Sequence, residues 1–114
     1  MDDARLSEAR TALLSERARL RAELSVEIEG PGQMTYGSQA AAATHVFEQQ
    51  RDLALRERNQ RHLADVETAL ERIEAGTYGR CRRCGTEIAA ERLEALPWAA
   101  YCIDCQQAIA RERA

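Results

Sequence analysis

Four cysteines are the residues of this chain whose types and spacing could do chemistry. They form two C-x2-C pairs, Cys81 with Cys84 and Cys102 with Cys105, and seventeen residues separate the pairs. This spacing lies within the range expected of a four-cysteine zinc site. Zinc prefers four soft tetrahedral ligands, and two residues between cysteines let a tight turn aim both sulfurs at one ion. The pattern therefore predicts one structural zinc ion held by Cys81, Cys84, Cys102 and Cys105.

Two disulfides are the competing use of the four cysteines. Disulfides persist in oxidising compartments, and the sequence begins with the acidic run Met1-Asp2-Asp3 where a secretory signal would be basic. No apolar run approaches the ~18 residues that a membrane span needs. We therefore expect a cytoplasmic protein without a membrane segment, whose thiols stay reduced and bind metal.

A catalytic role for the zinc is not expected. A catalytic zinc keeps one position open for water and usually has histidine or a carboxylate among its ligands, whereas four thiolates close the site. The two histidines, His45 and His62, lie seventeen residues apart in a helical pattern and are expected to face solvent. No phosphate-binding glycine loop, nucleophile elbow or metalloprotease helix occurs. The chain is therefore not expected to be an enzyme.

The elements that must position the cysteines are helices. Ala, Glu, Leu and Arg supply 62 of the 114 residues, 54 %, which is typical of long helices or coiled coils. Sixteen basic and nineteen acidic residues leave a net charge of −3. Because neither half of the chain is strongly basic, direct and specific DNA binding is not expected.

Two amphipathic helices are predicted before the cysteines, the first over about residues 4–28 and the second from about residue 40 to Gly76. Between them, residues 29–38 contain three glycines and one proline, the strongest loop signal in the chain. The second helix is expected to keep a seam at heptad-like spacing. The seam positions are Leu6, Ala9, Leu13, Leu20, Leu24 and Ile28 in the first helix, and Val46, Leu53, Gln60, Leu63, Val66, Leu70 and Ile73 in the second.

These elements predict an all-α protein with two domains. Residues 1–75 form an antiparallel coiled-coil helical hairpin with its tip at about residues 29–38, and residues 76–114 form a small four-cysteine zinc finger. A short C-terminal helix is expected from about Ile103, and Gly85 can take the positive φ that the turn after the first cysteine pair requires. The hairpin either serves only as a coiled coil or presents its tip to a partner, and the amphipathic pattern leaves both open.

The cysteines belong to a longer pattern of residues. It consists of the run GTYGRCRRCG at 76–85, Ile88, Arg92-Leu93-Glu94-Ala95, Pro97, Cys102 and Cys105-Gln106. This pattern resembles the DksA/TraR family of zinc-finger transcription regulators. The resemblance covers residues 76 to about 107 closely, and residues 47–73 resemble the family's second coiled-coil helix more loosely.

This resemblance implies a partner, bacterial RNA polymerase. The finger and C-terminal helix would sit on the rim of the polymerase's secondary channel, and the coiled-coil arm would point toward the active site. The candidate partner-binding residues are Met34, Tyr36 and Ser38 at the tip and Arg92 in the finger. The alternative is a coiled-coil protein-interaction module that docks on some other protein and uses the zinc finger only as a structural clasp.

The chain departs from the family's pattern in two places. Members that modulate initiation carry acidic residues at the tip of the arm, whereas residues 30–44 here contain no Asp or Glu. Relatives that respond to guanosine tetraphosphate gather basic side chains where arm and finger meet, and here several of those positions are not basic, so binding of this nucleotide stays open. The non-basic residues are Asp65, Leu96 and Gln106, and the arginines that remain nearby are Arg58, Arg61 and Arg92.

Overall fold

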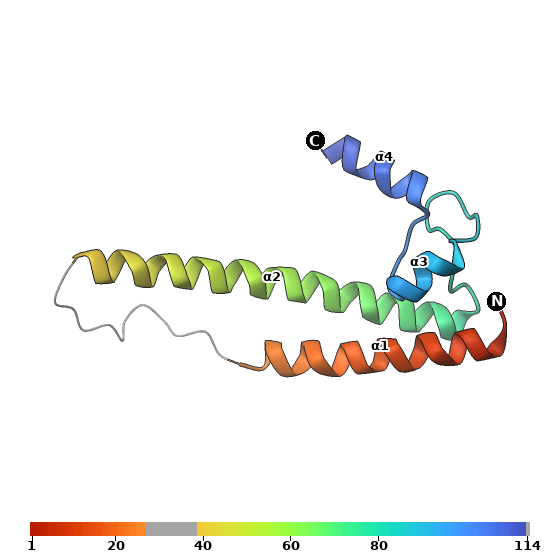
Figure 1. Ribbon diagram of the computed structural model, residues 1–114, viewed down its shortest axis with the longest axis horizontal. Helices are drawn as coiled ribbons and strands as arrows, with labels where there is room; N and C mark the ends of the chain where they lie inside the picture. Colours follow the sequence, from red (N-terminus) through yellow and green to blue (C-terminus); the bar gives the residue numbers. More distant parts are fainter. Residues whose placement is uncertain (27–38, 114) are drawn as a thin grey trace.

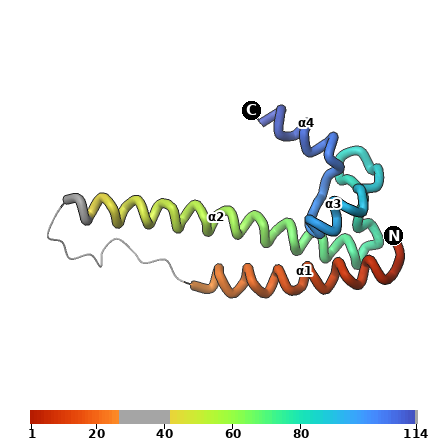
Figure 2. The backbone as a smooth tube through the Cα atoms, in the orientation of Figure 1, coloured from red at the N-terminus to blue at the C-terminus, as the bar shows by residue number. Residues whose placement is uncertain are grey.

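The computed structural model describes residues 1–26 and 39–113, and in these ranges the chain forms four helices and one isolated β-bridge, between Arg80 and Glu87. Two long helices lie side by side in opposite directions and make an arm, and the C-terminal part folds against one end of it (Figure 1). The N-terminus lies at that same end (Figure 2). In the two described ranges, no helix is both long and apolar enough to cross a membrane. The predicted all-α hairpin followed by a finger is confirmed.

The first helix, α1, spans Asp3–Leu24. Its start is capped because the Arg5 amide donates a hydrogen bond to the Asp2 carboxylate at 2.8 Å. Asp3 adds a negative charge in the first turn, where the helix dipole is positive. The acidic start of the sequence is therefore a helix start.

The prediction that this helix continues beyond Leu24 is wrong, because α1 ends at Leu24. Ile28, the predicted last residue, lies outside the described residues. The Ser25 hydroxyl donates to the Ala22 carbonyl at 2.7 Å, and the Ser25 amide donates to the Arg21 carbonyl at 3.0 Å. A serine that satisfies the last carbonyls locally offers the backbone an alternative to further helix. Periodicity alone does not show such a local stop.

The second helix, α2, spans Gln39–Ala75, and its 37 residues extend over about 55 Å at 1.5 Å per residue. It ends before Gly76, whose φ of +76° is left-handed, as the sequence predicts. Cross-helix ion pairs join Arg10 to Glu74 and, at 3.1 Å, Arg21 to Glu67. These pairs are exposed, so each stabilises the arm by about 1 kcal/mol at most.

The core of the arm lies in the half nearest the finger. Leu13, Leu20 and Val66 are fully buried, and Ala69 is 6 % exposed. Toward the tip from Leu20, no described side chain of the arm is buried. The predicted seam is confirmed where other expected seam residues pack against this cluster, namely Leu6, Ala9, Leu63, Leu70 and Ile73.

The seam predicted for the outer half of α2 is wrong. Val46 is 44 % exposed and Leu53 is 51 % exposed. Each helical residue turns the chain by about 100°, so the twenty residues from Val46 to Val66 add up to about 200° once whole turns are removed. Val46 therefore lies nearly opposite the buried face, and the heptad spacing between Val46 and Leu53 marks an outward stripe.

Polar residues continue the buried stripe in the outer half of α2. The Asn59 side-chain amide donates to a Glu23 carboxylate oxygen at 3.1 Å. The Arg56 guanidinium donates to the Val26 carbonyl, also at 3.1 Å. The outer half of the described arm is therefore joined by polar contacts, whereas its base is joined by apolar packing.

Two short helices complete the finger. The first, α3, spans Ala90–Ala95 and was not predicted; its anchor is Leu93, which is 5 % exposed. The second, α4, spans Ile103–Arg113, starts where the sequence predicts, and projects away from the arm (Figure 1). The division into two domains at residue 75 stays a prediction.

The unequal roles of two leucines give a direct test of this core. We expect Leu20→Ala to lower the free energy of unfolding by roughly 2–5 kcal/mol, because it empties a fully buried site. Leu53→Ala, at a leucine that is 51 % exposed, serves as the matched control and is expected to cost less than about 0.5 kcal/mol. Urea unfolding followed by circular dichroism measures both. Equal losses would place Leu53 in the core and contradict the outward stripe.

Candidate metal centre

The structure brings the four cysteine sulfurs together from two turns. Cys81 and Cys84 flank the turn after the β-bridge residue Arg80, and Cys102 and Cys105 lie at the start of α4. The four Sγ atoms all lie within 4.8 Å of one another, and those of Cys84 and Cys102 are 3.8 Å apart. A tetrahedral site with zinc–sulfur bonds of ~2.3 Å separates its sulfurs by about 3.8 Å. All four cysteines are free, so the alternative of two disulfides is not supported.

A tight hairpin aims the first pair of sulfurs. The Gly85 amide donates to the Cys81 carbonyl at 3.0 Å, and the Cys81 amide donates to the Thr86 carbonyl at 2.8 Å. Gly85 has a φ of +78°, a conformation that side chains with a Cβ disfavour, and this confirms the predicted turn. The Arg83 amide points back at the Cys81 sulfur at 3.4 Å. The backbone thus already solvates one thiolate.

The second pair uses the start of a helix. The Gln106 amide donates to the Cys102 carbonyl at 2.9 Å, and the Cys105 amide approaches the Cys102 sulfur at 3.5 Å. Unsatisfied amides and the positive end of the dipole favour a negative sulfur at this place. The Arg82 amide donates to the Ala100 carbonyl at 2.8 Å and joins the two turns.

The thiols differ in how readily they ionise without a cation. Burial opposes ionisation of Cys81, but backbone hydrogen bonds, including that from the Arg83 amide, lower its pKa to about 6. The hydrogen bond with the Cys102 thiol, together with burial, raises the pKa of Cys105 to about 12. Thiolates this close repel one another, so all four ionise together only when a cation shares their charge. The donor set and its spacing fit zinc.

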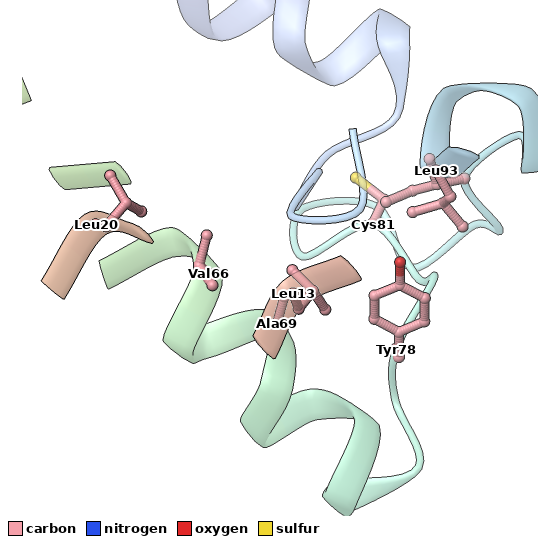
Figure 3. Packing of buried hydrophobic residues seen from close by; sticks show 8 residues of the cluster. Leu13, Leu20, Val66, Ala69, Tyr78, Cys81 and Leu93 are labelled. Carbon is pink, nitrogen blue, oxygen red and sulfur yellow. The ribbon is translucent and has the colours of Figure 1, made fainter. Parts of the chain in front are cut away.

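A small apolar cluster packs the centre against the arm. In Figure 3 the Tyr78 ring lies below the finger residues Cys81 and Leu93, with the arm residues Leu13 and Ala69 to one side, and all five belong to one buried cluster. The Tyr78 hydroxyl donates to a backbone carbonyl of the finger, that of residue 97, at 2.8 Å, and burial raises the pKa of this phenol. Cys81 and the core of the arm therefore belong to one apolar cluster.

Two arginines near the cysteines have partners inside the finger. Arg83 donates two hydrogen bonds to the Glu112 carboxylate, at 2.6 and 3.3 Å, and thereby ties the first turn to the end of α4. This guanidinium also lowers the pKa of Glu112. The Arg92 side chain donates to the Tyr101 carbonyl at 3.2 Å. A contact of Arg92 with a partner stays a prediction.

The expectation that both histidines face solvent is wrong. The His62 ring makes an edge-on contact with Trp98 of the finger, with centroids 4.4 Å apart, and lies 3.2 Å from a Glu16 carboxylate oxygen. The Arg19 guanidinium, and to a smaller extent His62, hold the pKa of Glu16 below its usual range. Nε2 of His45 is also enclosed. Helical spacing places these histidines on α2 but does not show what packs across from them.

The junction of arm and finger holds some of the basic residues that the sequence singles out. A hollow of about 560 Å³ has Trp98 of the finger in its lining, and its charged and histidine residues come from both arm helices: Glu16 and Arg19 from α1, and Arg58, Arg61, His62 and Asp65 from α2. Glu16 and Asp65 offset part of the positive charge there. Arg92 does not line this hollow.

The other candidate partner-binding residues are those predicted to lie at the tip. Met34, Tyr36 and Ser38 fall outside the described residues, so their roles stay predictions.

Comparison with known proteins gives matches to the finger and to the whole fold. The prokaryotic dksA/traR C4-type zinc finger matches residues 76–111. The solved structure of transcription factor DksA2 from Pseudomonas aeruginosa is similar over 100 % of this chain and 90 % of its own length, with 30 % identity and a TM-score of 0.77. The RNA polymerase binding protein and transcriptional regulator Dks from Chlamydia trachomatis shares the fold at 22 % identity, with a TM-score of 0.62 over 98 % and 94 % of the two chains.

Curated relatives match over shorter stretches. The RNA polymerase-binding transcription factor DksA of Escherichia coli is 40 % identical over 55 residues, which are 48 % of this chain and 36 % of that protein. Protein YteA of Bacillus subtilis is 51 % identical over 57 residues, 50 % of this chain and 24 % of that protein. The match thus spans about a third or less of these curated relatives.

The finger match and the four clustered sulfurs agree with each other and with the predicted cofactor, one structural zinc ion. The similarity to the Pseudomonas structure extends that agreement from the finger to the arm. This chain belongs to the DksA/TraR family of C4-type zinc-finger proteins.

Proposed function

We propose that this chain is a cytoplasmic, non-enzymatic transcription regulator that binds RNA polymerase at its secondary channel. The observation that carries the proposal is the similarity of the whole chain, arm and finger together, to the structure of transcription factor DksA2. A relative that is 40 % identical over 55 residues is named an RNA polymerase-binding transcription factor. A long arm with a compact base suits a protein that reaches into a channel while its finger stays outside.

The surface of the arm supports a partner at its outer half. Val46, Phe47, Leu53 and Leu55 are exposed, Phe47 by 73 %, and they are the exposed large apolar residues in the described part of α2. Apolar side chains in such a short segment are stabilised when another protein covers them. The rival function, an interaction module for some other protein, predicts the same surface and differs only in the partner.

The zinc ligands we propose are Cys81, Cys84, Cys102 and Cys105. The closeness of the four sulfurs and the backbone amides aimed at two of them support this set. A closed set of four thiolates leaves no position for a reacting water, so the ion's role is to hold the finger together.

The lack of acidic residues at the predicted tip bears on how this chain would affect initiation. Residues 30–44 contain no Asp or Glu, and carboxylates are the hard ligands that magnesium prefers. We propose that the arm occupies the channel but has a weak or altered effect on initiation, as a competitor of acidic-tipped relatives would. The alternative is that Glu27 and Glu29, just before this interval, supply the missing carboxylates.

A crosslinking experiment tests the partner and the channel. A photo-crosslinking amino acid at position 47, on the outer arm, is expected to capture residues inside the secondary channel of purified core RNA polymerase. The same group at position 103, on α4, serves as the matched probe and is expected to capture residues on the rim. Absence of polymerase crosslinks from both positions, with zinc content intact, would favour the interaction module.

Replacing one proposed ligand tests the metal centre. Because structural zinc binds with roughly 10–16 kcal/mol, Cys84→Ser is expected to unfold residues 76–107 and to lose zinc, while the arm keeps most of its helix. Gln107→Ala, at an exposed residue of α4, is the matched control and should retain one zinc per chain. Metal analysis and circular dichroism read the two effects. Loss of most of the helix in Cys84→Ser would show that the arm depends on the finger, and full zinc content would exclude Cys84 as a ligand.

A double substitution tests the tip. In transcription from purified components, the chain is expected to inhibit initiation weakly or not at all, because its neutral tip cannot engage the catalytic magnesium. If Glu27 and Glu29 supply the carboxylates, inhibition is measurable and disappears in the Glu27→Gln, Glu29→Gln variant. Strong promoter-specific inhibition that survives in this variant would contradict any account in which tip carboxylates act on the metal.

A further inference from the structure

The strap that joins arm to finger, residues 76–80, is short and intrinsically compliant. It leads from the end of α2 to Cys81, and both of its glycines have left-handed backbones, with φ of +76° at Gly76 and +86° at Gly79. Glycine restricts its backbone less than any other residue. Left to itself, such a strap allows the finger many directions relative to the arm.

Arg72, in the last turn of α2, holds this strap by four hydrogen bonds. Its carbonyl accepts from the Thr77 amide at 2.9 Å and from the Tyr78 amide at 3.2 Å. Its guanidinium Nη2 donates to the Thr77 carbonyl at 2.9 Å and to the Arg80 carbonyl at 2.6 Å. The backbone and side chain of Arg72 therefore hold the strap near its start, at Thr77 and Tyr78, and at its end, at Arg80. Arg80 directly precedes Cys81.

We propose that Arg72 is the positioning residue that sets the direction of the zinc finger relative to the arm. Its two carbonyl acceptors lie on either side of Gly79, so the guanidinium removes the freedom that this glycine introduces. Because Arg80 forms the β-bridge with Glu87, a fixed Arg80 carbonyl also fixes the hairpin that carries the first cysteine pair.

Other contacts across the junction resist separation but do not set the direction as strictly. Tyr78 packs into the arm's core, and Trp98 makes its edge-on contact with His62. The hydrogen bonds from the Tyr78 hydroxyl to the Pro97 carbonyl and from the Ile88 amide to the Gly79 carbonyl join the strap to the finger and do not reach the arm. Packing between apolar surfaces is non-directional, whereas hydrogen bonds weaken steeply when their angle changes. Arginine suits this role better than lysine, because its planar fork presents donors in a fixed arrangement and an ammonium does not.

The inference does not depend on the proposed partner, since it concerns the free protein. Its relevance to the proposed function is that a partner contacted by arm and finger at once is recognised only if their relative direction is held. Distances within the isolated chain therefore test the role of Arg72 separately from polymerase binding.

The test measures one distance that spans the junction. Spin labels carried by non-natural amino acids, which leave the cysteines untouched, replace Gln60 on α2 and Gln107 on α4, two exposed residues. Pulsed electron resonance of the zinc-loaded protein is expected to give one narrow distance distribution. Arg72→Lys should broaden it, and Arg72→Met should broaden it more, with zinc content and helix signal unchanged. Arg51→Lys, at an exposed arginine of the same helix, is the matched control and should leave the width unchanged.

The role of Arg72 is overturned if both Arg72 variants keep the wild-type width, or if Arg51→Lys broadens the distribution as much as Arg72→Lys does. If Arg72 only stabilises the fold, Arg72→Lys lowers the unfolding temperature but leaves the width of the distance distribution unchanged well below that temperature. That result would also overturn the positioning role. If Arg72→Met loses zinc, the lysine variant, which keeps the charge and the alkyl stem, decides alone. Broadening together with unchanged polymerase affinity would support the positioning role and show that the partner does not require it.

Discussion

Mutual repulsion among four closely spaced sulfurs, relieved by one cation, is the constraint on which the finger depends. The described residues beyond α2 bury only four side chains, Tyr78, Cys81, Ile88 and Leu93. Apart from Cys81, only three apolar side chains are buried in this described part, which is too few to hold a domain of this size together without a metal. Zinc, at roughly 10–16 kcal/mol, therefore decides whether the finger folds.

The arm is stabilised differently at its two ends. Its base buries Leu13, Leu20 and Val66 completely and continues into the finger through Tyr78. Its outer half places polar residues such as Asn59 on the side that faces α1 and leaves apolar residues such as Leu53 outside. Exposed polar contacts exchange easily with water, so local opening costs less there than at the base. A rigid base and a compliant outer half follow from the order of residues along one helix.

The features that the sequence predicts correctly are those that depend on residues close together in the chain. The cysteine spacing, the stop at Gly76 and the start of α4 at Ile103 are local, and the structure has the two helix boundaries where they are expected. The face of α2 that meets α1 depends on accumulated rotation over twenty residues, so a heptad count that held at Val66 failed at Val46. His62 contacts Glu16 and Trp98, which are forty-six and thirty-six residues away in the chain. No pattern within α2 predicts contacts with residues so far away.

Neither the zinc centre nor the core of the arm determines the orientation of the finger relative to the arm. The metal fixes the two cysteine turns relative to each other, and the leucine core fixes α1 relative to α2, but the strap between Gly76 and Arg80 belongs to neither. Among the contacts of the described residues that hold arm and finger together, Tyr78 packs against the core of the arm, His62 meets Trp98, and Arg72 binds the strap's carbonyls. Of these, only the last has the directionality of hydrogen bonds from a charged donor. The direction in which the finger faces is thus set by the last turn of the arm rather than by the metal centre.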